Sequence, residues 1–180
     1  MRVFVAIEIS NEDTINSIKK FQDKINIDAK PVKLKNFHFT LQFLGEISEE
    51  ITHKIVQALH TIEFSSFSIT LKGTGAFPKS KIPRVIWIGT DENGGNMLIQ
   101  LSKEVEKVLE PLGFFSDKPF KPHITIFRIK KKIGDITNEL ESQKVTNFGT
   151  QKISSIKLKK SELTPSGPIY SDLMEVQAVK

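Results

Sequence analysis

The sequence predicts an α+β fold of two pseudo-symmetric lobes, each an antiparallel sheet backed by helices, with a central cleft between them. Two observations predict it. The order strand, helix, strand, helix, strand occurs twice along the 180 residues, and no Ser/Gly-rich linker separates the two copies. A short His-x-Thr pattern also recurs once in each copy. We therefore expect residues 1–180 to form a single two-lobed domain.

The elements of the first copy follow from hydrophobic pattern and capping residues. Runs of β-branched and aromatic residues predict strands, and apolar side chains three or four positions apart predict helices. Asn11 or Ser10 is expected to cap the first helix, and Ser48 the second. The elements are expected at about residues 2–9, 11–25, 32–44, 49–62 and 67–71.

The second copy repeats this order. A turn at Asn93-Gly94-Gly95 is expected to separate its first strand from a long amphipathic helix. Its first four elements are expected at about residues 84–90, 96–109, 119–129 and 133–142. The tail, from about residue 150 to 180, is expected to form two strands joined by a turn at residues 164–168.

The composition limits the classes of function. The net charge of +5 and the sequence pI of about 9.3 suit a phosphate-bearing partner such as RNA or a nucleotide. The absence of cysteine excludes disulfides, thiolate nucleophiles and cysteine-bearing zinc sites. No apolar run approaches the roughly 20 residues of a membrane span, and residues 2–9 fit a buried strand better than a signal peptide. We expect a cytoplasmic protein without membrane association.

The repeated pattern reads His38-Phe39-Thr40-Leu41 in the first copy and His123-Ile124-Thr125-Ile126 in the second. Because side chains alternate along a strand, each histidine is expected to share a face with its threonine. Phe39, Leu41 and Phe43 are expected to share the opposite, apolar face. Two lobes meeting at their polar faces would form a cleft with a His–Thr pair on each wall.

Two imidazoles that face one phosphate form an acid–base pair. An unperturbed histidine titrates near pH 6.5, so a neutral and a protonated ring coexist near neutrality. The neutral ring takes a proton from the attacking group, and the protonated ring gives one to the leaving oxygen. Thr40 and Thr125 are expected to donate hydrogen bonds to the phosphate oxygens. The alternative is that His38 and His123 are packed beneath a sheet without a catalytic role.

We expect neither a metal ion nor another cofactor. The other two histidines, His53 and His60, lie on a predicted helix without the i, i+4 spacing of a metal pair. No cluster of carboxylates accompanies any histidine in the sequence. The predicted chemistry is therefore metal-independent.

Six segments carry a resemblance to one family. They are Arg2–Ile7, His38–Gly45, Gly73–Pro78, Pro83–Gly89, Lys121–Arg128 and Ser161–Tyr170. These segments resemble the 2H phosphoesterase superfamily, named for two His-x-Thr/Ser-x motifs. Within it, they are most similar to the LigT-like RNA 2′,3′-cyclic phosphodiesterases, historically called 2′-5′ RNA ligases.

The resemblance implies hydrolysis of a terminal 2′,3′-cyclic phosphate on RNA, tRNA-derived RNA included, to a 2′-phosphate and a free 3′-hydroxyl. It implies that His123 is the proton acceptor that activates water and that His38 is the proton donor to the departing 3′-oxygen. Arg128 resembles a family arginine that binds the phosphate. Strict alternation puts Arg128 on the face opposite His123, so it reaches the cleft only if the strand bends or bulges. We expect a monomer.

Several alternatives stay open at this level. The same two histidines could join a 2′,3′-cyclic phosphate to a 5′-hydroxyl, which is 2′-5′ RNA ligation. The substrate could instead be a small cyclic nucleotide or an ADP-ribose cyclic phosphate. A nucleotide- or RNA-binding module without turnover would use the same fold. Phe4, Trp87 and Tyr170 could stack on a base, but we assign Phe4 and Trp87 to the core.

Overall fold

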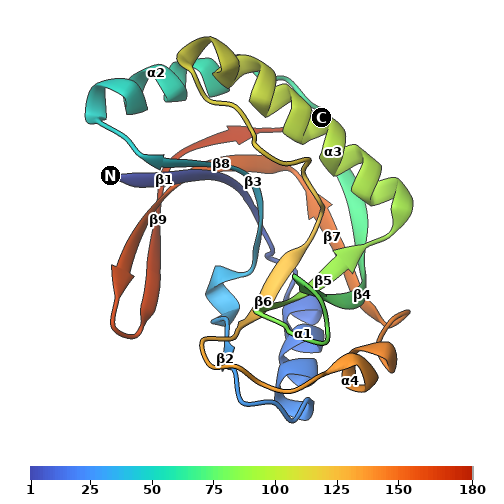
Figure 1. Ribbon diagram of the computed structural model, residues 1–180. Helices are drawn as coiled ribbons and strands as arrows, with labels where there is room; N and C mark the ends of the chain where they lie inside the picture. The colour runs from blue at the N-terminus through green and yellow to red at the C-terminus, as the bar shows by residue number, and fades with distance from the viewer. Residues whose placement is uncertain (180) are drawn as a thin grey trace.

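The computed structural model describes residues 1–179 and consists of two antiparallel sheets with helices packed against them (Figure 1). The helices are α1 (Glu12–Lys24), α2 (Glu49–Leu59), α3 (Glu92–Leu109) and α4 (Thr137–Glu141), with 3₁₀ turns at Leu34–Asn36 and Glu110–Leu112. The strands are β1 (Arg2–Glu8), β2 (Lys30–Pro31), β3 (His38–Glu46), β4 (Phe67–Phe77), β5 (Val85–Thr90), β6 (Ile124–Arg128), β7 (Asn147–Ile153), β8 (Ser155–Thr164) and β9 (Gly167–Gln177). The predicted α+β class with two antiparallel sheets is confirmed.

Each sheet takes strands from both halves of the chain. The first sheet has the order β3-β1-β8-β9, and the second has the order β2-β6-β5-β4-β7. Strand β4, from the first half, thus completes the second sheet, while β8 and β9, from the end of the chain, complete the first. Apart from the short edge strand β2, the two sheets have the same plan, which is what an internal duplication with exchanged strands produces.

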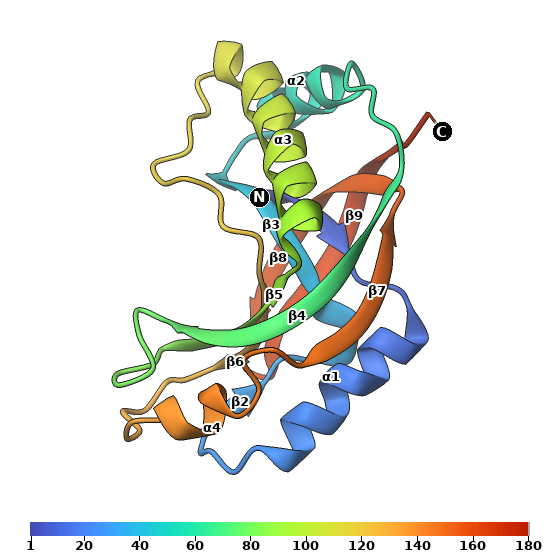
Figure 2. The ribbon, with the colours of Figure 1, turned by 90° about the vertical axis from the view of Figure 1, so that its right-hand side faces the viewer.

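The helices leave one face of the first sheet open. Figure 2 shows α3 and α1 on opposite sides of the curved strand β4, and α1 packs against β7 and β6. On β1, Val3, Val5 and Ile7 are buried in the core, whereas Phe4 and Glu8 alternate with them on the other face. That other face is concave and carries the first histidine motif, as described below.

Two predicted strands are shorter than the sequence suggested. The expected strand over residues 32–44 is interrupted by a 3₁₀ turn, so that β3 begins at His38 itself. The expected strand over residues 119–129 begins only at Ile124, because Pro119 and Pro122 have no N–H to donate to a neighbouring strand. Each motif histidine therefore stands at the entry to its strand, with a carbonyl of the preceding loop beside it.

Three further predictions were wrong in their bounds. The predicted turn at Asn93-Gly94-Gly95 is the first turn of α3, which Asp91 caps by accepting a hydrogen bond from the Gly94 N–H at 2.9 Å. The strand predicted at 67–71 continues to Phe77, and the helix predicted at 133–142 forms only over Thr137–Glu141. The C-terminal part contains a third strand, β7.

Among residues 1–179, no helix combines the length and apolar character that a membrane crossing requires.

Candidate active site

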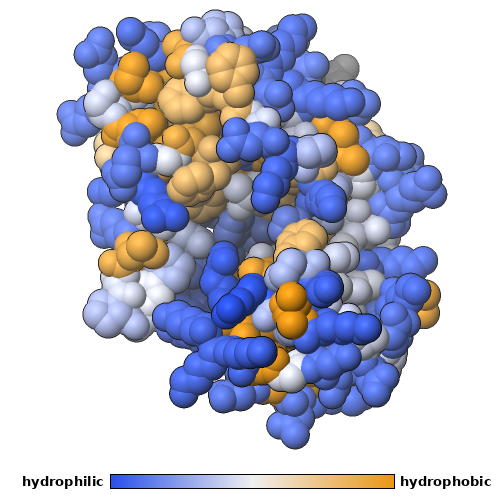
Figure 3. Space-filling model, in the orientation of Figure 1, coloured by the Kyte–Doolittle hydropathy of each residue, from blue (hydrophilic) through white to orange (hydrophobic). Residues whose placement is uncertain are grey.

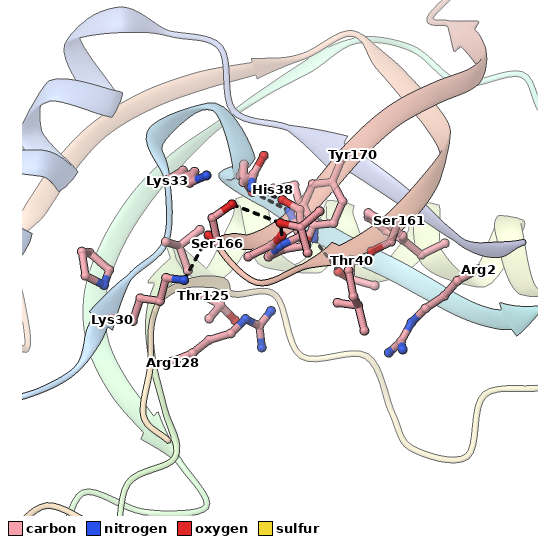
Figure 4. A pocket seen from close by; sticks show the side chains of 18 of the residues that line it. Arg2, Lys30, Lys33, His38, Thr40, Thr125, Arg128, Ser161, Ser166 and Tyr170 are labelled. Carbon is pink, nitrogen blue, oxygen red and sulfur yellow. Dashed lines mark hydrogen bonds between the residues drawn. The ribbon is translucent and has the colours of Figure 1, made fainter. Parts of the chain in front are cut away.

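A cavity of about 440 Å³ opens between the concave face of the first sheet and the edge of the second. Four of the five predicted site residues line it, namely His38 and Thr40 from β3 and Thr125 and Arg128 from β6. In the space-filling view, this face is hollowed and hydrophilic side chains gather along its lower rim (Figure 3). Figure 4 shows how the labelled side chains converge on the cavity.

A bulge in β3 decides which side chains face the cavity. Glu8 pairs with His38 and Ala6 with Thr40, but the next pairs are Val5 with Gln42 and Phe4 with Phe43, so Leu41 is the extra residue. The prediction that Phe43 lies on the apolar face is therefore wrong. Phe43 is 53% exposed and lines the cavity, while Leu41 is only 5% exposed. The pattern of apolar letters gave no sign of this inversion.

The same bulge occurs at the same place in β6. Trp87 pairs with Thr125, but the following pairs are Ile86 with Phe127 and Val85 with Arg128, which leaves Ile126 as the extra residue. This inversion brings Arg128 to the face of Thr125 and into the cavity. The condition that the sequence left open for Arg128, a bulge in the strand, is met. Arg128 and Phe43 occupy equivalent positions, five residues after their histidines.

Both imidazoles are held by the same hydrogen bond. The Nδ1 atom of His38 lies 2.7 Å from the carbonyl oxygen of Asn36, and Nδ1 of His123 lies 2.6 Å from that of Lys121. Because a carbonyl can only accept, each Nδ1 carries the proton in the neutral ring. The Nε2 atom is then free to accept or, once protonated, to donate. In His38, Nε2 lies 2.9 Å from the Thr40 hydroxyl, which donates to it.

His123 lies beside the cavity but is not among the residues that line it. It directly precedes β6, two positions before Thr125, and alternation puts both on one face. Its ring is in edge contact with Phe77, with centroids 5.0 Å apart, and with Trp87, with centroids 6.3 Å apart. These two rings fix the orientation of His123, and His38 is likewise in contact with Phe4 and Tyr170. Phe4 is buried, as expected, although its ring touches the site.

The surroundings of both histidines favour the neutral ring. The pKa of His38 is lowered from 6.5 to about 4, chiefly by burial and to a smaller extent by Lys159 and Arg128, while the hydrogen bond to Asn36 opposes the shift. Burial also lowers the pKa of His123, with smaller contributions from Arg128 and Lys121. In the free protein near pH 7, therefore, neither ring carries a proton on Nε2.

A cluster of four charges lies behind His38 on the concave face. Lys159 is 6% exposed and pairs with Glu8 and with Asp172, at 2.8 Å from the latter. Lys157 pairs with the same two carboxylates, at 3.1 and 2.8 Å. The pairs link β1, β8 and β9 next to His38, whose partner on β1 is Glu8. Burial raises the pKa of both carboxyls, and the two lysines outweigh it, so that the pKa values of Glu8 and Asp172 are lowered.

Sequence reasoning missed several cavity residues. Arg2 and Ser161 lie at one end, where Phe43 packs against Arg2, and Lys30 and Lys33 lie at the other (Figure 4); Lys130 lines the cavity as well. The equal spacing of Phe43 and Arg128 from their histidines was a usable signal; the lysines lie outside any motif. In residues 1–179, no group of three or more His, Asp or Glu side chains is arranged to hold a metal ion.

The duplicated geometry has a counterpart among known proteins. Residues 7–87 and 88–170 each match the family described as LigT-like phosphoesterases. The chain belongs to the LigT-like phosphoesterase family. The boundary between the two matches falls at Ile88, so each match contains one of the two histidine motifs.

Individual relatives of this LigT-like phosphoesterase are similar over nearly its whole length. An Archaeoglobus fulgidus protein named RNA 2′,3′-cyclic phosphodiesterase is 38% identical over 175 residues, which is 96% of this chain and 98% of the relative. The crystal structure of a Thermus thermophilus protein has a TM-score of 0.82 at 30% identity, covering 98% of this chain and 97% of that one. Escherichia coli LigT complexed with 3′-AMP has a TM-score of 0.80 at 26% identity, covering 99% and 98%.

Proposed function

We propose that this protein hydrolyses the terminal 2′,3′-cyclic phosphate of RNA to a 2′-phosphate and a free 3′-hydroxyl. The observation that carries the proposal is the duplicated arrangement of histidine, threonine and bulge, which aims His38, Thr40, Thr125 and Arg128 at one cavity. The similarity to relatives named RNA 2′,3′-cyclic phosphodiesterase supports the same reaction. The complex of E. coli LigT with 3′-AMP supports a nucleotide in this cavity.

In the proposed mechanism, Nε2 of His123 takes a proton from a water molecule, whose oxygen attacks the phosphorus. The bond from phosphorus to the 3′-oxygen breaks, and Nε2 of the protonated His38 gives its proton to that oxygen. The 2′-oxygen keeps the phosphate. His123 ends protonated and His38 neutral, and proton exchange with solvent restores both. The division of roles follows the family resemblance; the hydrogen bonds at Nδ1 support Nε2 as the working atom of both rings.

The remaining site residues act on the phosphate itself. Arg128 neutralises the charge of the phosphate oxygens, and its fork of N–H donors matches their geometry. Thr40 and Thr125 donate hydrogen bonds to the same oxygens as negative charge develops. In the free protein, Thr40 donates to His38 Nε2 instead, so substrate has to redirect that hydroxyl. The anion raises the pKa of His38, which takes up its proton as substrate binds.

The test is an RNA oligonucleotide that ends in a 2′,3′-cyclic phosphate, incubated in EDTA with and without an RNA that has a 5′-hydroxyl. Conversion to a 2′-phosphomonoester in both samples supports hydrolysis without a metal. A joined RNA in the second sample, with little hydrolysis in either, would make the protein a ligase. Tight binding without any product would leave a binding module.

We further propose that residues 1–180 act as one domain and as a monomer in the cytoplasm, on RNA ends that include those of tRNA. His38, Thr40, Thr125 and Arg128 come from both halves of this chain and line one cavity, which supports a site whose reacting groups are all supplied by one copy. Light scattering at the concentrations used for the assay tests this. Activity that appears only with dimer formation would contradict it.

A further inference from the structure

The cavity carries more positive charge than one cyclic phosphate requires. Five cations line it and, within residues 1–179, no Asp or Glu does; the five are Arg2, Lys30, Lys33, Arg128 and Lys130. None of them takes part in an ion pair of the described chain. A cyclic phosphodiester carries a single negative charge, which Arg128 already faces beside the threonines. The other four cations surround space that the reacting phosphate does not fill.

These cations fall into two groups at opposite ends of the cavity. Arg2 lies over the ring of Phe43, with its guanidinium carbon 5.0 Å from the ring centre. Lys30 and Lys33 come from β2 and the loop after it, on the other side of His38 (Figure 4). Lys30 pairs with Arg128 across the β2–β6 ladder, and Lys130 follows Arg128 by two positions. One end is therefore aromatic and cationic, and the other has three lysines.

At the lysine end of the cavity, one ammonium group is hydrogen-bonded to the protein and two are not. The ammonium of Lys30 donates to the carbonyl of Ser166 at 3.0 Å and thereby ties β2 to the β8–β9 turn, which borders the cavity. The side chains of Lys33 and Lys130 make no hydrogen bond or ion pair with any residue among 1–179. Two ammonium groups thus face the cavity with their donors unused by the protein.

The shape of a nucleotide indicates which of its groups each end of the cavity would bind. The base leaves the ribose at C1′ and the chain leaves at C5′, on either side of the edge that carries the 2′- and 3′-oxygens. A terminal nucleotide whose cyclic phosphate sits at His38 must send its base toward one end and its 5′-phosphodiester toward the other. An exposed ring with a stacked guanidinium suits a base, since base–aromatic stacking tolerates any sequence. Lysines suit the phosphodiester.

We propose that Lys30, Lys33 and Lys130 form a subsite for the phosphodiester on the 5′ side of the terminal nucleotide. The protein then selects an oligonucleotide with a cyclic end over a mononucleoside cyclic phosphate. This inference rests on the proposed function, since it places the cyclic phosphate at His38. The subsite would distinguish RNA from small cyclic phosphates by the negatively charged phosphodiester that precedes the terminal nucleotide in RNA.

The experiment compares kcat/KM for a tetranucleotide and for a mononucleoside, both ending in a 2′,3′-cyclic phosphate, at low salt. Because two ammonium groups contact the added phosphates, we expect the tetranucleotide to be favoured about tenfold or more, which corresponds to about 1.4 kcal/mol. The double variant Lys33→Ala/Lys130→Ala is expected to lower that ratio about fivefold or more. Lys30 is left in place because it also holds the β8–β9 turn.

The matched control is Lys35→Ala/Lys132→Ala, which removes the same charge two positions further along the chain in each case, at exposed residues that do not line the cavity. It is expected to keep the wild-type ratio. Equal ratios in the two double variants, or a wild-type ratio near one, would overturn the subsite even if hydrolysis is confirmed. If neither substrate turns over, the proposed function fails. The subsite is then judged by the affinities for a mononucleotide and a tetranucleotide that end in a 2′-phosphate, and equal affinities overturn it.

Discussion

Arg128 and Thr125 face the same cavity although three positions of β6 separate them. Regular alternation would put them on opposite faces, but the strand bulges at Ile126, and Thr125 and Arg128 then pair with Trp87 and Val85 on one face of β5. The arginine thus stands beside the hydroxyl that would hold the same phosphate. The bulge thus determines the position of the guanidinium. Without it, the guanidinium would lie on the opposite face of β6, away from the cavity.

We expect Arg128→Ala to lower kcat/KM for the cyclic phosphate about 100-fold, because one charged donor to the reacting phosphate is lost. Arg128→Lys should recover part of this, since it restores the charge but not the fork of donors. Arg84→Ala is the control, at an exposed arginine just before β5 that does not line the cavity. Equal activity of the two alanine variants would remove Arg128 from the site.

Ligand binding is expected to protonate His38. Burial holds its pKa at about 4 in the free protein, so a proton donor exists near pH 7 only if the bound anion raises that pKa. NMR titration of the imidazole signals, with and without a 2′-phosphorylated nucleotide, measures both states. A pKa that stays near 4 in the complex would speak against His38 as the donor and in favour of the reverse assignment.

Stability should fall as the pH drops from about 6.5 toward 4. The folded pKa of His38 is about 4 and the unfolded value lies near 6.5, so within this window the unfolded chain binds more protons. The contribution is fully present above pH 6.5 and amounts to about 3 kcal/mol across the window. Denaturant unfolding at several pH values gives the slope. His38→Ala should flatten it, while the exposed His60→Ala should not; equal slopes in both would contradict the buried neutral ring.

Gly75→Ala is expected to shift the ring of His123 indirectly, through the indole of Trp87. Gly75 pairs with Trp87 across the β4–β5 ladder, and a methyl group there would overlap the indole ring that contacts His123. Overlap of this kind costs about 1–3 kcal/mol. Thermal unfolding and the emission of Trp87, the single tryptophan, report the change together with activity. Gly134→Ala, where a methyl group meets nothing within 4 Å, is the control. Equal stability of both variants would contradict the packing of Gly75 against the indole.

The sequence predicted those parts of the fold that depend on local pattern. Strands β1 and β5 and helix α1, with its cap at Asn11, lie where hydrophobic period and capping residues indicated. The turn at Asn93-Gly94-Gly95 was wrong because Asp91 caps the helix and close packing against Ile69 requires a residue without a side chain at Gly94. A glycine-rich sequence alone does not distinguish a reverse turn from the first turn of a tightly packed helix.

The site was predictable as far as its motifs and no further. His38, Thr40, Thr125 and Arg128 reach one cavity, but the letters around Phe43 and Arg128 do not reveal a bulge, which depends on the register of β1 and β5. The exchange of β4 and β8 between the sheets could not be predicted from the sequence either, because tertiary packing determines which strands pair. The lysine end of the cavity arises from segments that only the fold brings together.

The measurement that tests the central claim most directly is hydrolysis of an RNA ending in a 2′,3′-cyclic phosphate, in EDTA, by wild type, His38→Ala and His123→Ala. His53→Ala and His60→Ala, both at exposed positions of the same chain, are the controls. We predict that each site variant loses turnover by at least about 100-fold while the controls match wild type, with a 2′-phosphate as the product. Turnover retained by either site variant, or restored to wild type only by a divalent metal, would contradict an acid–base pair of two histidines.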